Sequence, residues 1–167
     1  VGPTDDVRRA AEAMEQQTDL PSAVCAVMAR LGVPSEAATK YLEPQLRDLL
    51  PDPLVLKDMN TAAARIVHSV RSKQKVAIFA DYDVDGATSG ALLVTWFRHF
   101  GIDCTLYIPD RITEGYGPNA PAMSDLASQH DLIICVDCGT LSHEAIAAAE
   151  SCDVIVLDHH LGGETLP

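Results

Sequence analysis

The second half of the chain alternates between short apolar runs and longer amphipathic segments. Apolar runs rich in β-branched residues predict buried strands at 75–80, 132–136 and 154–157, and a further strand is predicted at 103–108. Segments of helical periodicity predict helices at 60–72, 87–100, 119–128 and 142–150. Such alternation is typical of right-handed βαβ units, so we expect an α/β fold with a parallel sheet of about four or five strands flanked by helices.

The first part of the chain has a different pattern, made of short helical stretches. These predict helices at 6–17, 22–31 and 35–42, with Ser22 and Ser35 as N-caps. A connector punctuated by Pro44, Pro51 and Pro53 follows. We therefore expect a small helical segment with a proline-rich connector at 1–55, and an α/β domain at 56–167.

Composition narrows the class of protein. A hydrophobic content of 47% over 167 residues suffices for one sizeable core. No stretch approaches the roughly 18 apolar residues of a spanning helix, and the N-terminus lacks a signal pattern, so we expect a cytoplasmic protein without a membrane partner. The five cysteines are odd in number, which favours reduced thiols, and Cys135 is predicted to pack in the core.

Acidic residues and histidines directly follow three of the predicted strands. They are Asp81, Asp83, Asp85, Asp137, Asp158, His159 and His160. The carboxyl ends of parallel strands meet at one edge of a sheet, so these side chains are expected to converge there. Carboxylates crowded together repel one another unless a cation lies between them. The pattern therefore predicts a site for one or two divalent metal ions.

The stretch at 81–86, Asp-Tyr-Asp-Val-Asp-Gly, has three further interpretations. A calcium-binding loop is excluded by Leu92 at the position of the bidentate glutamate and by the preceding strand. A haloacid-dehalogenase-type phosphatase would use Asp81 as nucleophile and Asp83 as acid and base, but its fifth position is seldom aspartate. Simple capping of the next helix uses one carboxylate, and this stretch contains three.

The other two clusters also have simpler interpretations. Asp137, taken alone, is equally explained as a loop or cap residue. His159 and His160 could be two solvent-exposed loop residues, although adjacent histidines that leave a strand point in different directions, so that one can bind metal and the other a phosphate. The net charge of −12 argues against a nucleic-acid partner unless bound cations offset part of it.

Together these motifs resemble the DHH phosphoesterase superfamily. Flanking segments narrow the resemblance to its RecJ family of single-strand-specific exonucleases, at 49–53, 56–59, 108–111, 114–117 and 158–161. The likeness is strong from about residue 42 to residue 167 and loose before that. It implies a metal-dependent phosphodiesterase that degrades single-stranded DNA from a 5′ end in recombination and repair, with Mn²⁺ or Mg²⁺ as cofactor and two ions in the complete protein.

The resemblance also assigns roles to residues. It implies a catalytic set of Asp81, Asp83, Asp85, Asp137, His159 and His160. Among these the metal ligands are Asp83, Asp85, Asp137 and His159, with Asp81 either a ligand or a supporting group. Asp158 orients the histidines, whereas His160 and Arg111 contact the substrate phosphate. The simpler interpretation of Arg111 is a surface salt bridge with Asp110 or Glu114.

The implied partners are single-stranded DNA, single-stranded-DNA-binding protein and recombination helicases. The mixed carboxylate and imidazole ligands favour Mn²⁺ over Mg²⁺. We expect the chain to be the N-terminal part of a longer protein, ending before a fourth acidic motif and the DNA-gripping domains, and to be inactive or weak alone. Two alternatives stay open: a noncatalytic scaffold of the replication machinery, and a DHH phosphodiesterase that acts on short oligonucleotides or cyclic dinucleotides.

Overall fold

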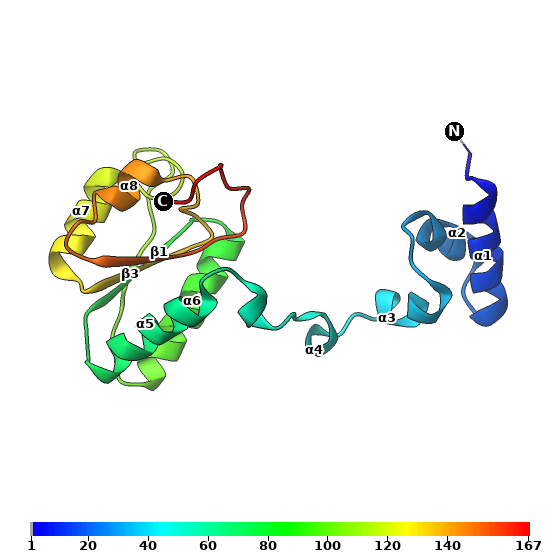
Figure 1. Ribbon diagram of the computed structural model, residues 1–167, viewed down its shortest axis with the longest axis horizontal. Coiled ribbons are helices and arrows are strands. Elements are labelled where there is room, and N and C mark those ends of the chain that lie inside the picture. The colour runs from blue at the N-terminus through cyan, green and yellow to red at the C-terminus, as the bar shows by residue number, and fades with distance from the viewer. Residues whose placement is uncertain (1) are drawn as a thin grey trace. The chain divides into compact units, whose positions relative to one another are not determined.

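A computed structural model describes residues 2–167. The chain divides into two compact units, one that ends at Val55 and one that spans Leu56–Pro167 (Figure 1). The first unit is helical. Its elements are α1 (Asp5–Gln17), α2 (Ser22–Arg30), the 3-10 turn η1 (Ser35–Ala37), α3 (Ala38–Leu42), α4 (Leu46–Leu49) and the 3-10 turn η2 (Pro53–Val55).

The helices of the first unit enclose a small core. Met14, Cys25, Met28 and Ala38 are its buried members. The predicted caps are wrong: α2 and η1 begin after Pro21 and Pro34 without a side-chain cap, and the Ser22 hydroxyl donates to Glu15 instead. The turns α4 and η2 were not predicted, because four and three residues are too few to show a helical period.

The second unit is an α/β domain. Its elements are α5 (Met59–Arg71), β1 (Val76–Ala80), α6 (Val84–His99), β2 (Thr105–Tyr107), α7 (Ala120–Gln129), β3 (Leu132–Val136), α8 (His143–Ala147) and β4 (Asp153–Leu157). The four strands form one sheet in the order β2-β1-β3-β4, and every neighbouring pair is parallel. The predicted α/β fold with a parallel sheet and flanking helices is therefore confirmed.

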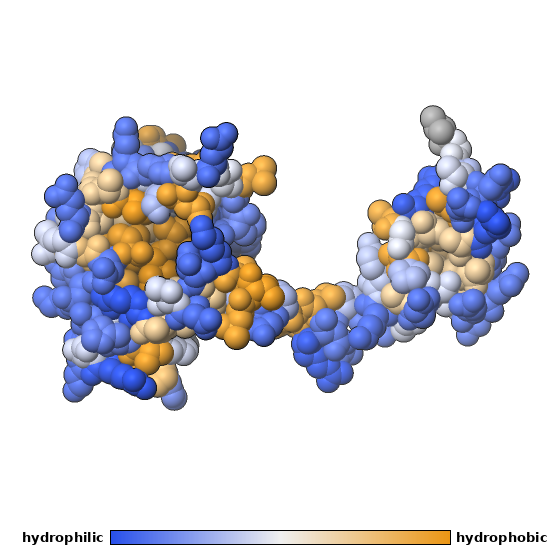
Figure 2. Space-filling model, viewed as in Figure 1, coloured by the Kyte–Doolittle hydropathy of each residue, from blue (hydrophilic) through white to orange (hydrophobic). Residues whose placement is uncertain are grey.

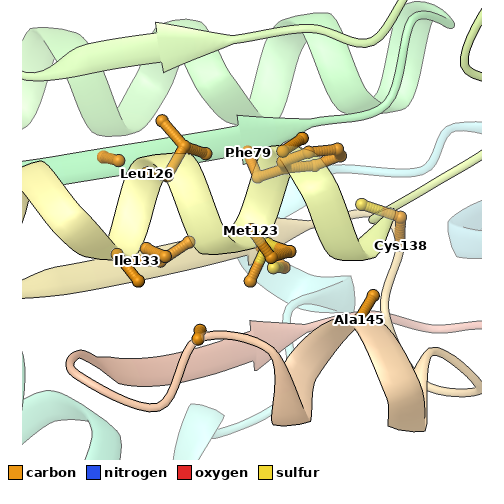
Figure 3. Packing of buried hydrophobic residues seen from close by; sticks show 11 residues of the cluster. Phe79, Met123, Leu126, Ile133, Cys138 and Ala145 are labelled. Atoms are coloured by element: carbon orange, nitrogen blue, oxygen red, sulfur yellow. The ribbon is translucent and has the colours of Figure 1, made fainter.

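The two central strands, β1 and β3, are buried on both faces, which explains their continuous apolar sequences. On one face Phe79 and Ile133 pack with α7 and α8, and Figure 3 shows Met123 and Leu126 of α7 lying over the strands. On the other face Ile78 and neighbouring strand residues pack with α5 and α6. Cys135 is fully buried in this core, as predicted, and burial raises the pKa of its thiol to about 12.

Element ends differ from the predictions where local contacts decide them. Helix α6 begins three residues before the predicted start, because Asp83 caps it. Strand β2 has three residues, and α8 has five. None of the described helices combines the length and the apolar character that crossing a bilayer requires.

Candidate metal centre

The register of the sheet brings three aspartates to one level. Ala80 pairs with Val136, and Val136 pairs with Leu157, so Asp81, Asp137 and Asp158 each lie one residue beyond adjacent strands. The main-chain ladder continues past the strands, since the Asp81 N–H donates to the Val136 carbonyl (3.4 Å) and the Asp137 N–H to the Leu157 carbonyl (2.9 Å). Neighbouring strands lie about 4.8 Å apart, so the sheet itself crowds these carboxylates.

The strand order places this level at a natural crevice. The chain leaves β1 through α6 on one face of the sheet and reaches β3 from α7 on the other. When the connections that leave two adjacent strands run to opposite faces of the sheet, a crevice that can bind a ligand opens beyond the carboxyl ends of those strands. Asp81 and Asp137 flank that point.

Asp81 is almost fully buried beneath the start of α6. It is 1% exposed, and its Oδ1 atom has no hydrogen-bond partner. Gly86 in α6 permits this proximity, because a Cβ atom there would lie 2.3 Å from the Asp81 carbonyl oxygen. A buried carboxylate oxygen without a donor is unfavourable unless a cation or water satisfies it.

Asp83 has two tasks. Its Oδ1 atom caps α6 by accepting from the main-chain N–H groups of Asp85 (2.9 Å) and Gly86 (3.0 Å). The Gly86 N–H in particular lowers the pKa of Asp83. The simple capping interpretation therefore holds for one carboxylate of the three, and Asp83 also contributes an oxygen to a cluster with Asp81 and Asp137.

Asp137 has an unusual backbone and a buried side chain. Its φ of 61° is left-handed, a conformation that costs a non-glycine residue roughly 1–2 kcal/mol. The side chain is 5% exposed. Its Oδ1 atom lies 3.1 Å from His159 Nε2 but has no partner in hydrogen-bond geometry. Burial, and then the neighbouring Asp83, raise the pKa of the Asp137 carboxyl.

Two clusters of potential ligands share Asp137. One consists of Asp81, Asp83 and Asp137, and the other of Asp137, His159 and His160; within each, one ligand atom per residue lies within 4.8 Å of the others. Carboxylate oxygens and imidazole nitrogens are suitable donors for Mn²⁺, and the two orphaned buried oxygens need a positive partner. The residues present therefore fit divalent cations.

Asp158 differs from the other two aspartates, because its carboxylate is fully bonded. Oδ2 accepts from the main-chain N–H (3.0 Å) and hydroxyl (2.6 Å) of Thr140, and Oδ1 contacts the N–H (3.2 Å) and Nδ1 (2.7 Å) of His160. Burial acts to raise the pKa of Asp158, but these hydrogen bonds outweigh it and lower the pKa. The hydrogen bond between the Asp158 carboxylate and the His160 ring also raises the pKa of His160.

Besides Asp158, two residues of the predicted set lie outside the clusters. Asp85 belongs to neither of them. The Arg111 guanidinium lies over the Tyr82 ring, 5.2 Å from its centroid, and among the described residues it forms no ion pair with Asp110 or Glu114. Those two acids serve the loop instead: Asp110 accepts from Ile112 and Thr113, and Glu114 accepts from the Asp110 N–H.

A groove of about 1260 Å³ adjoins the two clusters. Asp137, His159 and His160 line part of it, and residues of β4, of the first turns of α5 and α6 and of the C-terminal segment line most of the rest. Figure 2 shows apolar surface over the region of the second unit where β4 lies in Figure 1. A smaller cavity of about 460 Å³ at the starts of α7 and α8 contains no member of either cluster.

Sequence reasoning gave no role to Thr140 or Tyr116. Thr140 holds Asp158, and the Tyr116 hydroxyl donates to the Asp137 carbonyl (3.1 Å). Desolvation, and then Asp81, raise the pKa of Tyr116 to about 12, so the hydroxyl is a donor at neutral pH. The available signal was the Gly-Tyr-Gly stretch, in which both Gly115 and Gly117 have positive φ.

Comparison with known proteins agrees with this architecture. The chain is 35% identical over 160 residues to the single-stranded-DNA-specific exonuclease RecJ of Bacillus subtilis, covering 93% of this chain and 20% of that protein. It is 37% identical over 149 residues to the RecJ exonuclease of Thermus thermophilus, covering 84% and 22%. This chain thus spans about a fifth of the length of these relatives, and the resemblance to RecJ is confirmed.

Solved structures give the same result. A Thermus thermophilus RecJ in complex with Mn²⁺ matches all of this chain and 23% of its own, with a TM-score of 0.71 and 27% identity. An exonuclease RecJ bound to manganese matches 71% of this chain and 30% of its own, with a TM-score of 0.63 and 36% identity. A Mg²⁺ complex of the Thermus protein matches with a TM-score of 0.56 and 26% identity.

The family itself follows from a match that covers more than half of the chain. Residues 75–167, which include both ligand clusters, match the DHH family, N-terminal domain. The chain is a member of the DHH family.

Proposed function

We propose that this chain is the metal-binding part of a phosphodiesterase that removes nucleotides from the 5′ end of single-stranded DNA. The observation that carries the proposal is the shared carboxylate: Asp137 belongs to both ligand clusters at the edge of the sheet. The substrate class is supported by relatives of about 35% identity that are single-stranded-DNA-specific exonucleases. The complete activity belongs to a protein longer than this chain.

The proposed centre holds two Mn²⁺ or Mg²⁺ ions. Asp81, Asp83 and Asp137 would hold one, and Asp137 with His159 the other, while Asp85 stays a predicted ligand. Two such ions, when bound, supply a nucleophile at neutral pH and stabilise the attacking and leaving oxygens of an in-line displacement. The relatives solved with Mn²⁺ and with Mg²⁺ support both identities.

His160 is suited to binding the scissile phosphate. Its Nδ1 is engaged by Asp158, which fixes the ring, and the Tyr116 hydroxyl lies 3.4 Å from its Nε2. Because Asp158 also raises the pKa of His160, the imidazole carries more positive charge near neutral pH than a free histidine does. A fixed cationic donor stabilises negative charge that develops on a phosphate oxygen.

Arg111 is proposed as a second phosphate contact. Its guanidinium is exposed, unpaired with any described acid and supported by the ring of Tyr82, which lies between Asp81 and Asp83 in the chain. A guanidinium held in this way keeps its donors free for bidentate binding of a phosphate. With a net charge of −12, the chain needs further basic surface to grip DNA, and we assign that surface to other parts of the protein. Single-stranded-DNA-binding protein and recombination helicases as partners, and a cytoplasmic location, stay predictions.

The test uses the protein at its full genomic length and a 5′-labelled single-stranded oligonucleotide. We expect Mn²⁺-dependent release of nucleotides from the 5′ end, and loss of that release in Asp83→Ala and in His159→Ala. Asp125→Asn, on the exposed surface of α7, is the matched control and is expected to retain activity. Unchanged hydrolysis in the two alanine variants would refute the assignment of the metal centre to these residues. No hydrolysis by the wild type would refute the nuclease and favour the noncatalytic scaffold.

A further inference from the structure

Tyr116 contacts both parts of the proposed centre through a single hydroxyl group. The hydroxyl donates to the main-chain carbonyl of Asp137 at 3.1 Å. It also lies 3.3 Å from Nδ1 and 3.4 Å from Nε2 of His160, with the two rings at 78°. No other donor to the Asp137 carbonyl occurs among residues 2–167.

The Asp137 backbone needs such support. Its left-handed φ of 61° is unfavourable for a residue with a side chain, and such conformations persist only where surrounding contacts hold them. The Leu157 carbonyl fixes the N–H of Asp137, and the Tyr116 hydroxyl fixes its C=O. Both main-chain polar groups of Asp137 are therefore fixed by hydrogen bonds. The backbone that carries the shared carboxylate is fixed with them.

The loop that carries Tyr116 is itself well anchored. Glu114 accepts from the Tyr107 hydroxyl, from the Asp110 N–H (2.8 Å) and from Asn119 (3.3 Å). Gly115 and Gly117 adopt positive φ on either side of the tyrosine, which turns the main chain at that point. A Cβ atom on Gly117 would already touch Cys138, the residue after Asp137, so the two loops pack closely.

We propose that Tyr116 is a positioning residue of the metal centre, whose hydroxyl holds the Asp137 carbonyl and the His160 ring so that the shared carboxylate is aimed before any ion binds. The Tyr116 hydroxyl donates to the Asp137 carbonyl, so it acts on the ligands through this hydrogen bond. Residues that orient metal ligands in this way typically change metal affinity by about 10- to 100-fold when they are removed. The inference rests on the proposed metal site.

The experiment compares Tyr116→Phe, which deletes only the hydroxyl, with the wild type at full length. Tyr41→Phe is the matched control, because Tyr41 is similarly exposed (52% against 55%) and lies in the helical first unit. Hydrogen exchange of residues 136–140 is measured without metal, and Mn²⁺ affinity is measured by calorimetry.

We expect Tyr116→Phe to speed exchange at 137–139 and to weaken Mn²⁺ binding about tenfold, with β1 and β3 protected as in the wild type. Tyr41→Phe is expected to change neither. Unchanged exchange in that segment, or an unchanged Mn²⁺ affinity, would overturn the inference. If the wild type binds no Mn²⁺, the proposed function fails, and the exchange data alone decide whether the hydroxyl holds the Asp137 loop.

Discussion

Asp137 and Asp158 follow adjacent parallel strands at the same register, yet their carboxylates have opposite surroundings. Asp158 receives hydrogen bonds on both oxygens, and its pKa is lowered. Asp137 is buried with one oxygen unpartnered, and its pKa is raised. Position at the end of a strand therefore does not decide the role of an acid. What decides it is whether the protein itself supplies the donors.

The largest effect is expected from replacing the shared carboxylate. Asp137→Asn keeps the size and tolerates a left-handed φ, but it lacks the charge that would hold two ions. We expect Mn²⁺-dependent hydrolysis to fall by roughly a thousandfold, as befits several kcal/mol of lost stabilisation. Quenched-flow or gel assays of 5′ nucleotide release measure this.

The same variant is expected to be more stable than the wild type when metal is absent. Replacing a buried carboxylate that has one oxygen without a hydrogen bond by a neutral amide removes a penalty of roughly 1 kcal/mol or more. Chemical denaturation in the presence of a chelator measures the free energy of unfolding. A less stable metal-free variant would mean that Asp137 is satisfied within the protein.

A second large effect is expected from the glycine that lets α6 rest on Asp81. Gly86→Ala puts a Cβ atom 2.3 Å from the Asp81 carbonyl oxygen, so the start of α6 must shift. We expect a loss of about 1–3 kcal/mol in stability, together with weaker Mn²⁺ binding. Gly163→Ala, where the nearest atom would lie at 3.6 Å, is the control and should be close to neutral in denaturation curves.

Asp158→Asn is expected to change the stability of the metal-free protein in the opposite direction from Asp137→Asn. It weakens the bonds to Thr140 and His160, so the metal-free protein should lose about 1–3 kcal/mol. Activity should fall less than in Asp137→Asn, because His160 loses its orientation but both clusters keep their atoms. Equal stability of the two variants in urea would remove the distinction between the two aspartates.

The smallest effect is the pH dependence of these two differences. Because the pKa of Asp137 is raised in the folded state, its carboxylate destabilises the protein only as the pH rises above the ordinary value of 3.8. The gain in unfolding free energy from Asp137→Asn should therefore shrink as the pH is lowered from neutral to that value. Because the pKa of Asp158 is lowered in the folded state, its carboxylate stabilises the protein throughout the range from neutral pH to 3.8, and this stabilisation is lost only below 3.8. Unfolding of metal-free protein at several pH values checks both windows.

The sequence was sufficient to predict the fold and the edge of the sheet at which the acids of the candidate site meet. Continuous apolar runs at 76–80 and 132–136 mark strands buried on both faces, and acids directly after them must meet at one edge. Element ends were less accurate, as at α6, because the start of that helix depends on the Asp83 cap rather than on periodicity.

Partners within the site could not be predicted, since they depend on contacts between distant segments. Thr140 and Asp158 are 18 residues apart, and Tyr116 reaches Asp137 across 21 residues. Position after a strand does not distinguish Asp137 from Asp158, and only the family resemblance assigned them different roles. The difference arises from the left-handed turn at Asp137 and from the donors that lie within reach of each carboxylate.

The most direct test of the shared-carboxylate centre is a crystal structure of the protein with Mn²⁺, with the ions located by anomalous scattering. The account predicts two peaks about 3.5–4 Å apart, both within bonding distance of the Asp137 carboxylate. One peak would be bound by Asp81 and Asp83, and the other by His159. Peaks that do not touch Asp137, or a single ion bound through Asp158, would contradict it.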